Sequence, residues 1–575
     1  MKCLLLVALF VLPTPALAQD ANPAARAVYQ TGAIHHPVLA RRGMVSAQER
    51  VAAEIGADIL KQGGNAVDAA VAVGFALAVT HPQAGNLGGG GFMMIGESGG
   101  AATAIDFREQ APAGARRDMY LGEDGDVDNR LAQYSHLSAG VPGTVAGLLH
   151  ALETRGTMSR RAVLAPAIRL ADKGVVLTPL QALSLGAADS MDADPSSVAY
   201  FKGRIAGDVL VQRDLGRTLK RIAKDGRDGF YSGRTADLIV AEMERGNGLI
   251  SHDDLAAYTV VEREAVTGRF RGYAIAAMPP PSSGGVHLVQ MLNILSGYDL
   301  QDGGHNSARY LHRLIEAMRR AYADRSLYLG DPDFVDVPVA ALTDPAYADR
   351  LRDTIDPKTA TPSASILPGA VLPEESLNTT HYSVIDDDGM AVSVTYTLNF
   401  SYGSGYSVDG AGFLLNNEMD DFSAKPGSPN GYGLVGGEAN KIEPRKRPLS
   451  SMTPTLVFKD GEVVLATGSP GGSTIITAVL QTVLNLTEWE MNAAQSLHAP
   501  RIHHQWLPDR VITEPGISPD TLRLLQDMGH GFPVDESGRI ATTTLGVVNS
   551  VGRNGDWFTG ASDPRDPDGA AVGVD

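Results

Sequence analysis

Cysteine is almost absent from the chain, since Cys3 is the only one among 575 residues. It belongs to an apolar run, residues 3–12, which is followed by an Ala-x-Ala site that ends at Ala18. The run is too short to span a bilayer, so residues 1–18 are predicted to be a cleaved secretory signal peptide and not a membrane anchor. The mature protein would then have no cysteine, which excludes disulfides and thiol chemistry. It is expected to be secreted, and periplasmic if the source is Gram-negative.

Positive charge is also scarce. The chain has 48 Lys and Arg against 66 Asp and Glu, a formal net charge of −18 and a pI of about 5.2. This balance argues against nucleic acid or an anionic membrane surface as the main partner. The one basic cluster, "EPRKRPLSS" at 443–451, contains three cations beside a glutamate and two prolines. A solvated loop explains it as well as a binding partner would.

Long hydrophobic runs and metal-binding motifs are missing from the mature chain. The most apolar stretch, residues 65–81, is interrupted by Asp68 and spans only about four helical turns, so it is predicted to be a buried core helix. No His-Glu-x-x-His spacing occurs, and the neighbouring His503 and His504 would point to opposite faces of a strand. The glycine-rich "GSPGGS" at 468–473 lacks the Gly-Lys-Ser/Thr ending of a phosphate loop. We therefore expect no metal and no organic cofactor.

The remaining composition is ordinary for a large soluble protein, with 43% hydrophobic and 20% charged residues. Helices are predicted over 46–62, with a cap at Ser46, and over 307–329, where apolar residues recur at helical spacing. Segment 353–376 is rich in Pro, Ser, Thr and Ala without periodicity, which indicates an exposed linker. "PPPSSGG" at 279–285 is interpreted as structural turns. After the linker the chain changes to strands and glycine turns.

A β-hairpin is predicted directly after this linker, in "HYSVIDDDGMAVSVTYTL". A two-residue loop at 388–389 would set Thr379 opposite Leu398 and Thr380 opposite Thr397, within a residue or two. Side chains alternate between the two faces of a strand. The polar face of the second strand consists of Ser393, Thr395, Thr397 and Asn399. A row of polar side chains therefore ends beside Thr379.

Thr379 is a candidate nucleophile if it stands at a free N-terminus. A threonine hydroxyl inside a chain reacts poorly, but a terminal threonine has its own α-amino group as a general base, with a pKa of about 8. The bond between Asn378 and Thr379 would have to be cut, and the preceding linker is a place where a cut is tolerated. The alternative is structural, because threonine is a common strand residue and His381 is more often a packed side chain than a base.

Several longer motifs resemble the γ-glutamyltranspeptidases (glutathione hydrolases), a family of N-terminal nucleophile hydrolases. They are "GGNAVDAAVAVGFALAVTHPQAGNLGGGGFMM", "DFREQAP", "NTTHYSVIDDDGMAVSVTYTLNFSYGSG", "GFLLNNEMDDFSAKPG", "NGYGLVGGEANKIEPRKRPLSSMTPT", "GSPGGSTIIT" and "GASDPR". The resemblance covers residues from about 43 to about 566. It implies an α+β fold, a four-layer αββα sandwich, and self-cleavage into a large subunit, 19–378, and a small subunit, 379–575, that stay together.

The same resemblance implies roles for individual residues. Thr379 corresponds to the nucleophile, Thr397 to the threonine that hydrogen-bonds it, and the N–H groups of Gly471 and Gly472 to the oxyanion hole. The substrate-binding positions are Arg108, Ser450 and Ser451 for the α-carboxylate, Glu418 and Asp421 for the α-ammonium, and Asn399 as a further contact. Glu418 stands where some bacterial members have glutamine. Residues 428–440 correspond to a lid loop with Tyr432 as its aromatic gate.

The expected reaction is transfer of the γ-glutamyl group of glutathione and related compounds to water or to amino acid and dipeptide acceptors. Two alternatives stay open. A cephalosporin (glutaryl) acylase shares the fold and nucleophile but typically lacks the lid, and it would be indifferent to Glu418 and Asp421. A non-catalytic periplasmic binder of γ-glutamyl compounds would never cut itself.

Overall fold

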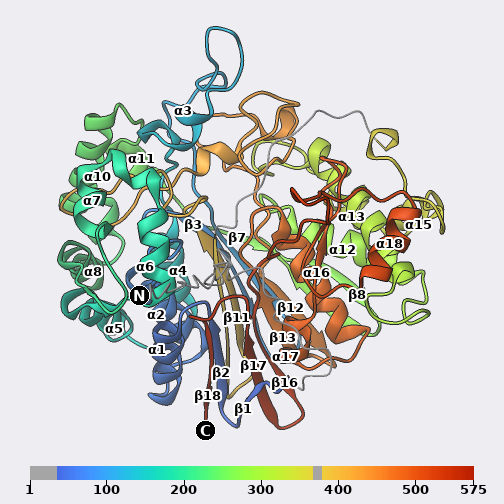
Figure 1. The fold of residues 1–575 in the computed structure, drawn as a ribbon. Coiled ribbons are helices and arrows are strands. Elements are labelled where there is room, and N and C mark those ends of the chain that lie inside the picture. The colour runs from blue at the N-terminus through green and yellow to red at the C-terminus, as the bar shows by residue number, and fades with distance from the viewer. Residues whose placement is uncertain (1–34, 367–378) are drawn as a thin grey trace, which may run out of the picture.

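The computed structural model describes residues 35–366 and 379–575 (Figure 1). The predicted signal peptide, residues 1–18, and Asn378 at the predicted cleavage site lie outside the described residues. Within them, no helix is both long and apolar enough to cross a membrane.

Two seven-stranded antiparallel sheets lie face to face at the centre of the molecule (Figure 1). The strands of the first sheet are, in spatial order, β18 (Ala570–Val574), β2 (Gly43–Ala47), β10 (Thr380–Asp386), β11 (Ala391–Thr397), β3 (Gly90–Gly96), β4 (Ala102–Phe107) and β7 (Val261–Glu264). Those of the second are β1 (Val38–Ala40), β17 (Trp557–Ser562), β16 (Asn549–Asn554), β13 (Glu462–Gly468), β12 (Thr455–Lys459), β9 (Tyr273–Ala277) and β8 (Val266–Phe270). Two short pairs are separate: β5 (Val175–Val176) with β6 (Val209–Leu210), and β14 (Ile502–His503) with β15 (Ile512–Thr513).

Helices cover the outer face of each sheet, so the predicted four-layer αββα sandwich is confirmed. On the side of the first sheet are α1 (Arg50–Lys61), α2 (Ala66–Thr80), α4 (Thr144–Arg155), α5 (Arg160–Lys173), α6 (Pro179–Ala187), α7 (Pro195–Phe201), α8 (Arg213–Asp225), α9 (Asp228–Tyr231), α10 (Gly233–Gly246) and α11 (His252–Ala257). On the side of the second are α12 (Gly284–Ser296), α13 (Ala308–Tyr328), α14 (Val339–Leu342), α15 (Pro345–Asp353), α16 (Thr474–Thr487), α17 (Ala493–His498) and α18 (Pro519–Asp527). The short α3 (Asn129–Gln133) lies above the sheets.

The apolar helix of the sequence is α2, and every one of its residues is buried between the first sheet and neighbouring helices. Asp68 is not a flaw in it, because its carboxylate completes a capping box with Asn65. The helix before it starts later than predicted. Glu49, and not Ser46, caps α1 by accepting hydrogen bonds from the first N–H groups, while Ser46 belongs to strand β2.

The hairpin forms as predicted, but its register differs by one residue. Its loop has three residues, 387–389, closed by a 3.0 Å hydrogen bond from Asp386 N–H to Met390 C=O. Gly389 takes the left-handed conformation, φ +83°, which the last position of such a loop requires. Thr380 therefore pairs with Tyr396. The same register sets Thr379 opposite Thr397, on one face of the sheet.

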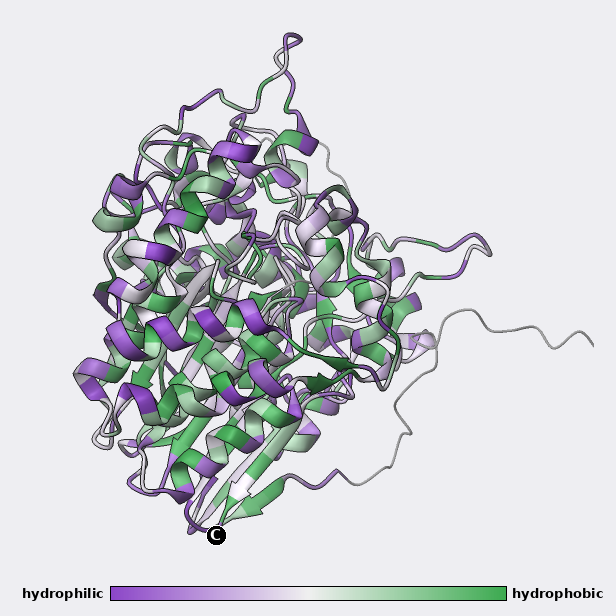
Figure 2. Ribbon diagram, turned by 90° about the vertical axis from the view of Figure 1, so that its left-hand side faces the viewer, coloured by the Kyte–Doolittle hydropathy of each residue, from purple (hydrophilic) through white to green (hydrophobic). Residues whose placement is uncertain are grey.

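The two faces of this hairpin have different neighbours. Apolar side chains such as Val384 and Val394 point to the helical layer and join its core. The opposite face meets the second sheet with polar groups: Ser383 Oγ donates to Asn549 C=O at 3.3 Å, and Ser393 Oγ to Thr467 C=O at 2.9 Å. Figure 2 shows the apolar strands behind helices whose outward faces are hydrophilic. Hydrogen bonds thus hold the sheets together near Thr379.

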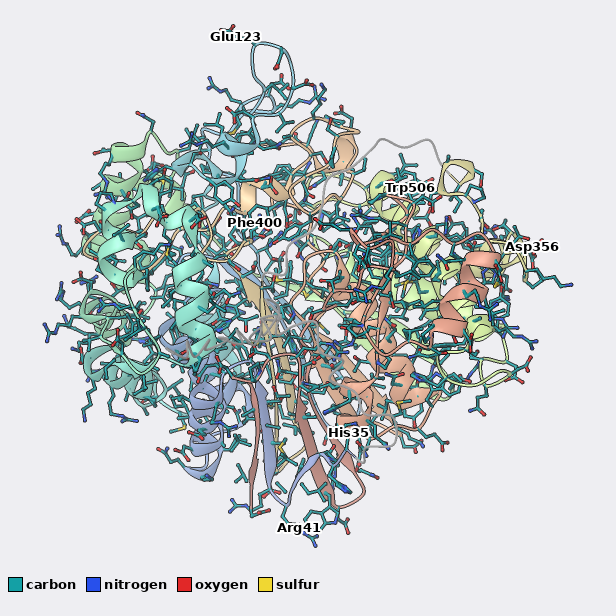
Figure 3. All side chains as sticks on the ribbon, in the orientation of Figure 1. His35, Arg41, Glu123, Asp356, Phe400 and Trp506 are labelled. Carbon is teal, nitrogen blue, oxygen red and sulfur yellow. The ribbon has the colours of Figure 1, made fainter. Side chains whose placement is uncertain are left out.

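The predicted linker is partly held against the body of the protein. Residues 354–366 are mostly exposed, but Ser363 is buried. Its N–H donates to Asp509 Oδ2 at 2.7 Å, and its C=O accepts from Nε1 of Trp506, which Figure 3 labels, at 3.0 Å. The expectation of a wholly exposed linker is therefore wrong up to this point, and residues 367–376 lie outside the described part.

Candidate active site

Thr379 directly precedes β10, at the open end of the central hairpin of the first sheet. Its side chain is buried, and Thr379 Oγ1 donates a hydrogen bond to Thr397 Oγ1 at 3.2 Å. Thr397 Oγ1 in turn accepts from Asn399 N–H at 2.9 Å. The backbone of Thr379 has φ +139°, a rare and strained value for a β-branched residue. The predicted polar neighbour is thus present, and the observed register brings it closer than the predicted one would.

A pocket opens at Thr379 and gathers nearly all the predicted site residues. Its lining consists of Arg108, Thr379, Thr397, Asn399, Glu418, Asp421, Tyr432, Leu434, Ser450, Ser451, Met452, Gly472 and Ile475. Among the predicted site residues that the structure describes, only Gly471 is not part of this lining. Residues more than 300 positions apart in the chain therefore meet within one pocket.

Arg108 lies just after β4, and its guanidinium is fully buried. It forms ion pairs with Glu418 and Asp421, which belong to a 3-10 turn, Glu418–Asp421. Nε also donates to Pro448 C=O at 3.2 Å. The predicted carboxylate-binding cation and the predicted ammonium-binding carboxylates thus contact each other directly.

Burial makes this cluster electrostatically unusual, because three carboxylates surround one guanidinium. Glu109 lies 3.7 Å from the Arg108 guanidinium, and burial raises its pKa to about 7. Burial also raises the pKa of Glu418 well above its ordinary value and that of Asp421 above its own, although the Arg108 charge acts in the opposite direction. Burial therefore favours the protonated form of these carboxyls, and the Arg108 charge opposes it.

A glycine loop joins β13 to α16 on another side of the pocket. Gly472 has φ +54°, and a Cβ there would lie 2.5 Å from the Tyr432 ring, so a side chain would collide with it. Gly471 has φ +133°. The loop leads into the N-terminus of α16, an end of a helix that favours negative charge.

Two residues of the predicted lid, 428–440, line the pocket: Tyr432 and Leu434. Tyr432 is buried, and its hydroxyl donates a hydrogen bond to Asn399 C=O at 2.7 Å. Its ring packs edge-on against the Phe400 ring, with 5.1 Å between the ring centroids. Figure 3 shows Phe400 near the middle of the molecule. Gly431 N–H donates to Asp420 Oδ2 at 2.9 Å, which ties the lid to the acidic turn.

Comparisons with known proteins agree with this geometry. Residues 52–573 match the family described as Gamma-glutamyltranspeptidase. The chain belongs to the γ-glutamyltranspeptidase family. The glutathione hydrolase proenzyme of Escherichia coli K12 is 52% identical over 548 residues, with 94% of this chain and 93% of that protein covered. The Acylase ACY 1 proenzyme of Pseudomonas sp. SE83 is 37% identical over 551 residues, with 94% of each covered.

Solved structures show the same fold. Cephalosporin acylase from Bacillus halodurans matches with a TM-score of 0.82 and 27% identity, covering 95% of this chain and 98% of that one. Helicobacter pylori γ-glutamyltranspeptidase matches with a TM-score of 0.55 and 48% identity, covering 56% of this chain and 93% of that one. The predicted family, enzyme class and fold are therefore confirmed.

In this γ-glutamyltranspeptidase family member, His381 directly follows the threonine pair, and its role is structural. Its Nδ1 faces Thr395 Oγ1 at 2.8 Å and its Nε2 faces Ser383 Oγ at 2.9 Å, so both ring nitrogens are occupied. Burial lowers its pKa to about 3. The imidazole is neutral at physiological pH and fixes the spacing of the two strands, as the structural interpretation predicts.

One group of side chains in the described ranges has the composition of a metal site: His312, Glu316 and His530. His312 Nδ1 lies 2.8 Å from His530 Nε2, a hydrogen-bond distance. Glu316 already accepts from Arg320 Nη1 at 2.6 Å and from Thr361 N–H at 3.0 Å. Because its oxygens are bonded to a cation and an amide, this carboxylate is a poor metal ligand. None of the three residues lines the Thr379 pocket.

Sequence reasoning missed three buried charged neighbours of the pocket: Glu109, Asp420 and Arg325. The first two are adjacent in sequence to the predicted site residues Arg108 and Asp421, and this adjacency is the only sequence signal for them. The third lies on α13, where it was one of several arginines in an amphipathic pattern.

Asp420 gives a testable pH dependence. Burial, and next the Asp421 charge, raise its pKa from 3.8 to about 7. Between these two pKa values the folded state binds a proton that the unfolded state releases. The protonated carboxyl therefore contributes to the free energy of unfolding at low pH, and this contribution is lost as the pH rises from about 4 to about 7. The asparagine in Asp420→Asn does not titrate, so the melting temperature of this variant relative to that of the wild type should increase as the pH rises from about 4 to about 7. Thermal unfolding at pH 5 and pH 8 measures it, with the exposed Asp556→Asn as control. An equal difference at both pH values would contradict the expectation.

Proposed function

We propose that the protein is a secreted, self-processing γ-glutamyltranspeptidase that acts on glutathione and other γ-glutamyl compounds. The observation that carries the proposal is the meeting of Thr379 and Thr397, through a 3.2 Å hydrogen bond, in a pocket with the Arg108 ion-pair cluster. A nucleophile at a chain terminus and a site for a zwitterion are the two parts that this reaction needs.

The precursor cuts itself between Asn378 and Thr379, and 19–378 and 379–575 remain together as large and small subunits. The strained backbone of Thr379 supports this step, because cleavage of the bond before it relieves the strain. The interleaving of the two parts supports their continued association, since β10 pairs with β2 and β11 pairs with β3. The H. pylori chain, which matches only 56% of this chain, has the extent expected of one such part.

In the reaction, Thr379 Oγ attacks the γ-amide carbonyl carbon and forms a C–O bond. The α-amine of Thr379 accepts the hydroxyl proton and delivers it to the leaving nitrogen as the C–N bond breaks. Thr397 orients the hydroxyl, and the N–H groups of Gly471 and Gly472 stabilise the tetrahedral oxyanion. Water, or the amine of an amino acid or dipeptide, then attacks the γ-glutamyl ester by the same proton route.

The γ-glutamyl group is recognised through its two charges. Its α-carboxylate pairs with Arg108 and accepts from the hydroxyls of Ser450 and Ser451. Its α-ammonium pairs with Glu418 and Asp421. A bound zwitterion can replace the Arg108 ion pairs, because its carboxylate compensates the guanidinium and its ammonium compensates the two carboxylates. An uncharged acyl group would leave these buried charges uncompensated. Asn399 is a further contact, and Tyr432 covers the bound group.

The test is release of the aniline from a γ-glutamyl anilide by purified, processed protein. Steady release, increased by an acceptor dipeptide, is expected. An intact N-terminal Thr379 with no release would contradict the proposal. A full-length band that persists after folding would favour the non-catalytic periplasmic binder.

The acylase alternative makes an opposite prediction about the acyl group. A glutaryl anilide lacks the α-ammonium, so its binding leaves Glu418 and Asp421 buried without their ligand charge. We expect kcat/KM for the γ-glutamyl anilide to exceed that for the glutaryl anilide by at least about 100-fold, since a site built for a polar group rejects analogues that lack it. Parallel kinetics of the two anilides measure the ratio. A preference for glutaryl would identify an acylase.

The periplasm is the proposed compartment, with no membrane anchor and no nucleic-acid partner. The predicted signal peptide and the net charge of −18 support these assignments.

A further inference from the structure

Arg325 is a buried cation that contacts Ser451 in the lining of the Thr379 pocket, and the reaction described above does not use it. It stands on α13 and is 5% exposed. Nε donates to Ser283 Oγ at 3.0 Å and Nη2 donates to Ser451 Oγ at 3.2 Å. Both partners are neutral hydroxyls. Among the ion pairs of residues 35–366 and 379–575, none includes Arg325.

This situation differs from that of Arg108, which has carboxylate partners. A buried guanidinium without an ion-pair partner is costly, and burial lowers the pKa of Arg325 to about 10, although the more distant Asp421 charge acts in the opposite direction. Arg325 lines, with Asp421 and Asn430, a second pocket, which shares Asp421 and Leu434 with the lining of the Thr379 pocket. A negatively charged ligand group in the pocket would therefore stabilise it.

The segment "PPPSSGG" connects Arg325 to the serine pair. Ser283 N–H and Oγ both donate to Ser450 C=O, at 2.8 and 2.7 Å, and Ser450 N–H donates to Pro281 C=O at 2.8 Å. Ser283 Oγ is also the acceptor for Arg325. These turns thus hold the backbone of the serine pair and the guanidinium together.

We propose that Arg325 is a second cation of the α-carboxylate site, a positioning residue that acts through Ser451 and selects γ-glutamyl donors with a free α-carboxylate. The inference rests on the proposed function. A serine hydroxyl has one proton and two lone pairs. Because Ser451 Oγ accepts from Arg325, its proton is directed elsewhere, and Ser451 lines the pocket. The adjacent positive charge strengthens the hydrogen bond that this proton donates to a carboxylate.

Arg108 alone does not supply this selectivity. Its guanidinium is already paired with Glu418 and Asp421, so the positive field that it presents to a substrate carboxylate is reduced. Arg325 restores a positive field on the serine side of the pocket. The α-carboxylate would then lie between Arg108 and the hydroxyl that Arg325 orients.

The experiment compares two donors, L-γ-glutamyl anilide and the same anilide with its α-carboxylate converted to a carboxamide. Wild type should prefer the acid. Arg325→Met should reduce kcat/KM for the acid by about 10- to 100-fold, mainly through KM, with little change for the carboxamide. Arg325→Lys should recover part of the preference. Arg313→Met, which removes a charge elsewhere on α13, is the matched control.

A double-mutant cycle tests the route through Ser451. Arg325→Met and Ser451→Ala should be strongly non-additive for the acid, because each removes the same oriented donor. Intact-mass analysis of the subunits shows that each variant is processed. Equal losses on both donors, or additive losses, would overturn the inference while leaving the proposed function intact. If wild type releases aniline from neither donor, the proposed function itself fails. If Arg325→Met does not fold, an unchanged preference in Arg325→Lys and Ser451→Ala overturns the inference.

Discussion

Thr379→Ala is expected to remain a single uncut chain with no γ-glutamyl activity. Its side chain lacks the oxygen that would attack both the preceding peptide bond and the substrate amide. Wild type should instead give two fragments with a junction between Asn378 and Thr379. Intact-mass analysis of the two purified proteins side by side measures the difference, and anilide hydrolysis should fall by at least about 10⁴-fold, as when a catalytic nucleophile is removed.

Two further variants show whether the effect belongs to this hydroxyl. Thr379→Ser retains an oxygen and should be processed, with reduced turnover. Thr380→Val is the matched control, because Thr380 Oγ1 is buried on the opposite face and has no hydrogen-bond partner among the described residues. It should be processed and active. Cleavage of the Thr379→Ala chain would show that another residue is the nucleophile of self-cleavage. A wild type that stays uncut would have no free α-amine at Thr379 and so would lack the proposed general base.

Arg108→Met is expected to have the second-largest effect, on both activity and stability. Removal of one partner from a buried ion pair costs about 3–5 kcal/mol, because the other charge stays buried without compensation. Here that charge is shared by Glu109, Glu418 and Asp421. We expect kcat/KM for a γ-glutamyl anilide to fall by about 10³-fold or more, since the carboxylate contact is lost as well.

The stability loss in Arg108→Met should depend on pH. Without the guanidinium, the pKa values of these carboxyls rise further above those of the unfolded chain. A raised carboxyl pKa contributes stability at low pH, and this contribution is lost as pH rises toward the folded pKa. The difference in melting temperature from wild type should therefore widen between pH 5 and pH 8. A constant difference, or one that narrows, would show that Arg108 does not compensate the cluster.

Several features could be predicted from local sequence because their causes are local. The apolar run with one acidic residue predicts a buried helix, which is α2. The alternation of residues 391–398 predicts that Thr395 and Thr397 share one face of a strand. The hairpin register was missed by one residue, because loop length depends on which residue takes the left-handed conformation. That residue is Gly389, at the end of a three-residue loop.

The sequence by itself determined which chemistry is present: the threonine that begins a strand, the acidic turn, the glycine loop and the serine pair. Only the tertiary structure decided how their charges are balanced. Arg108 meets Glu418 across 310 residues of chain, and Arg325 on α13 reaches Ser451 across 126 residues. Electrostatic balance depends on distance and burial after packing, and neither quantity has a local pattern in the order of residues.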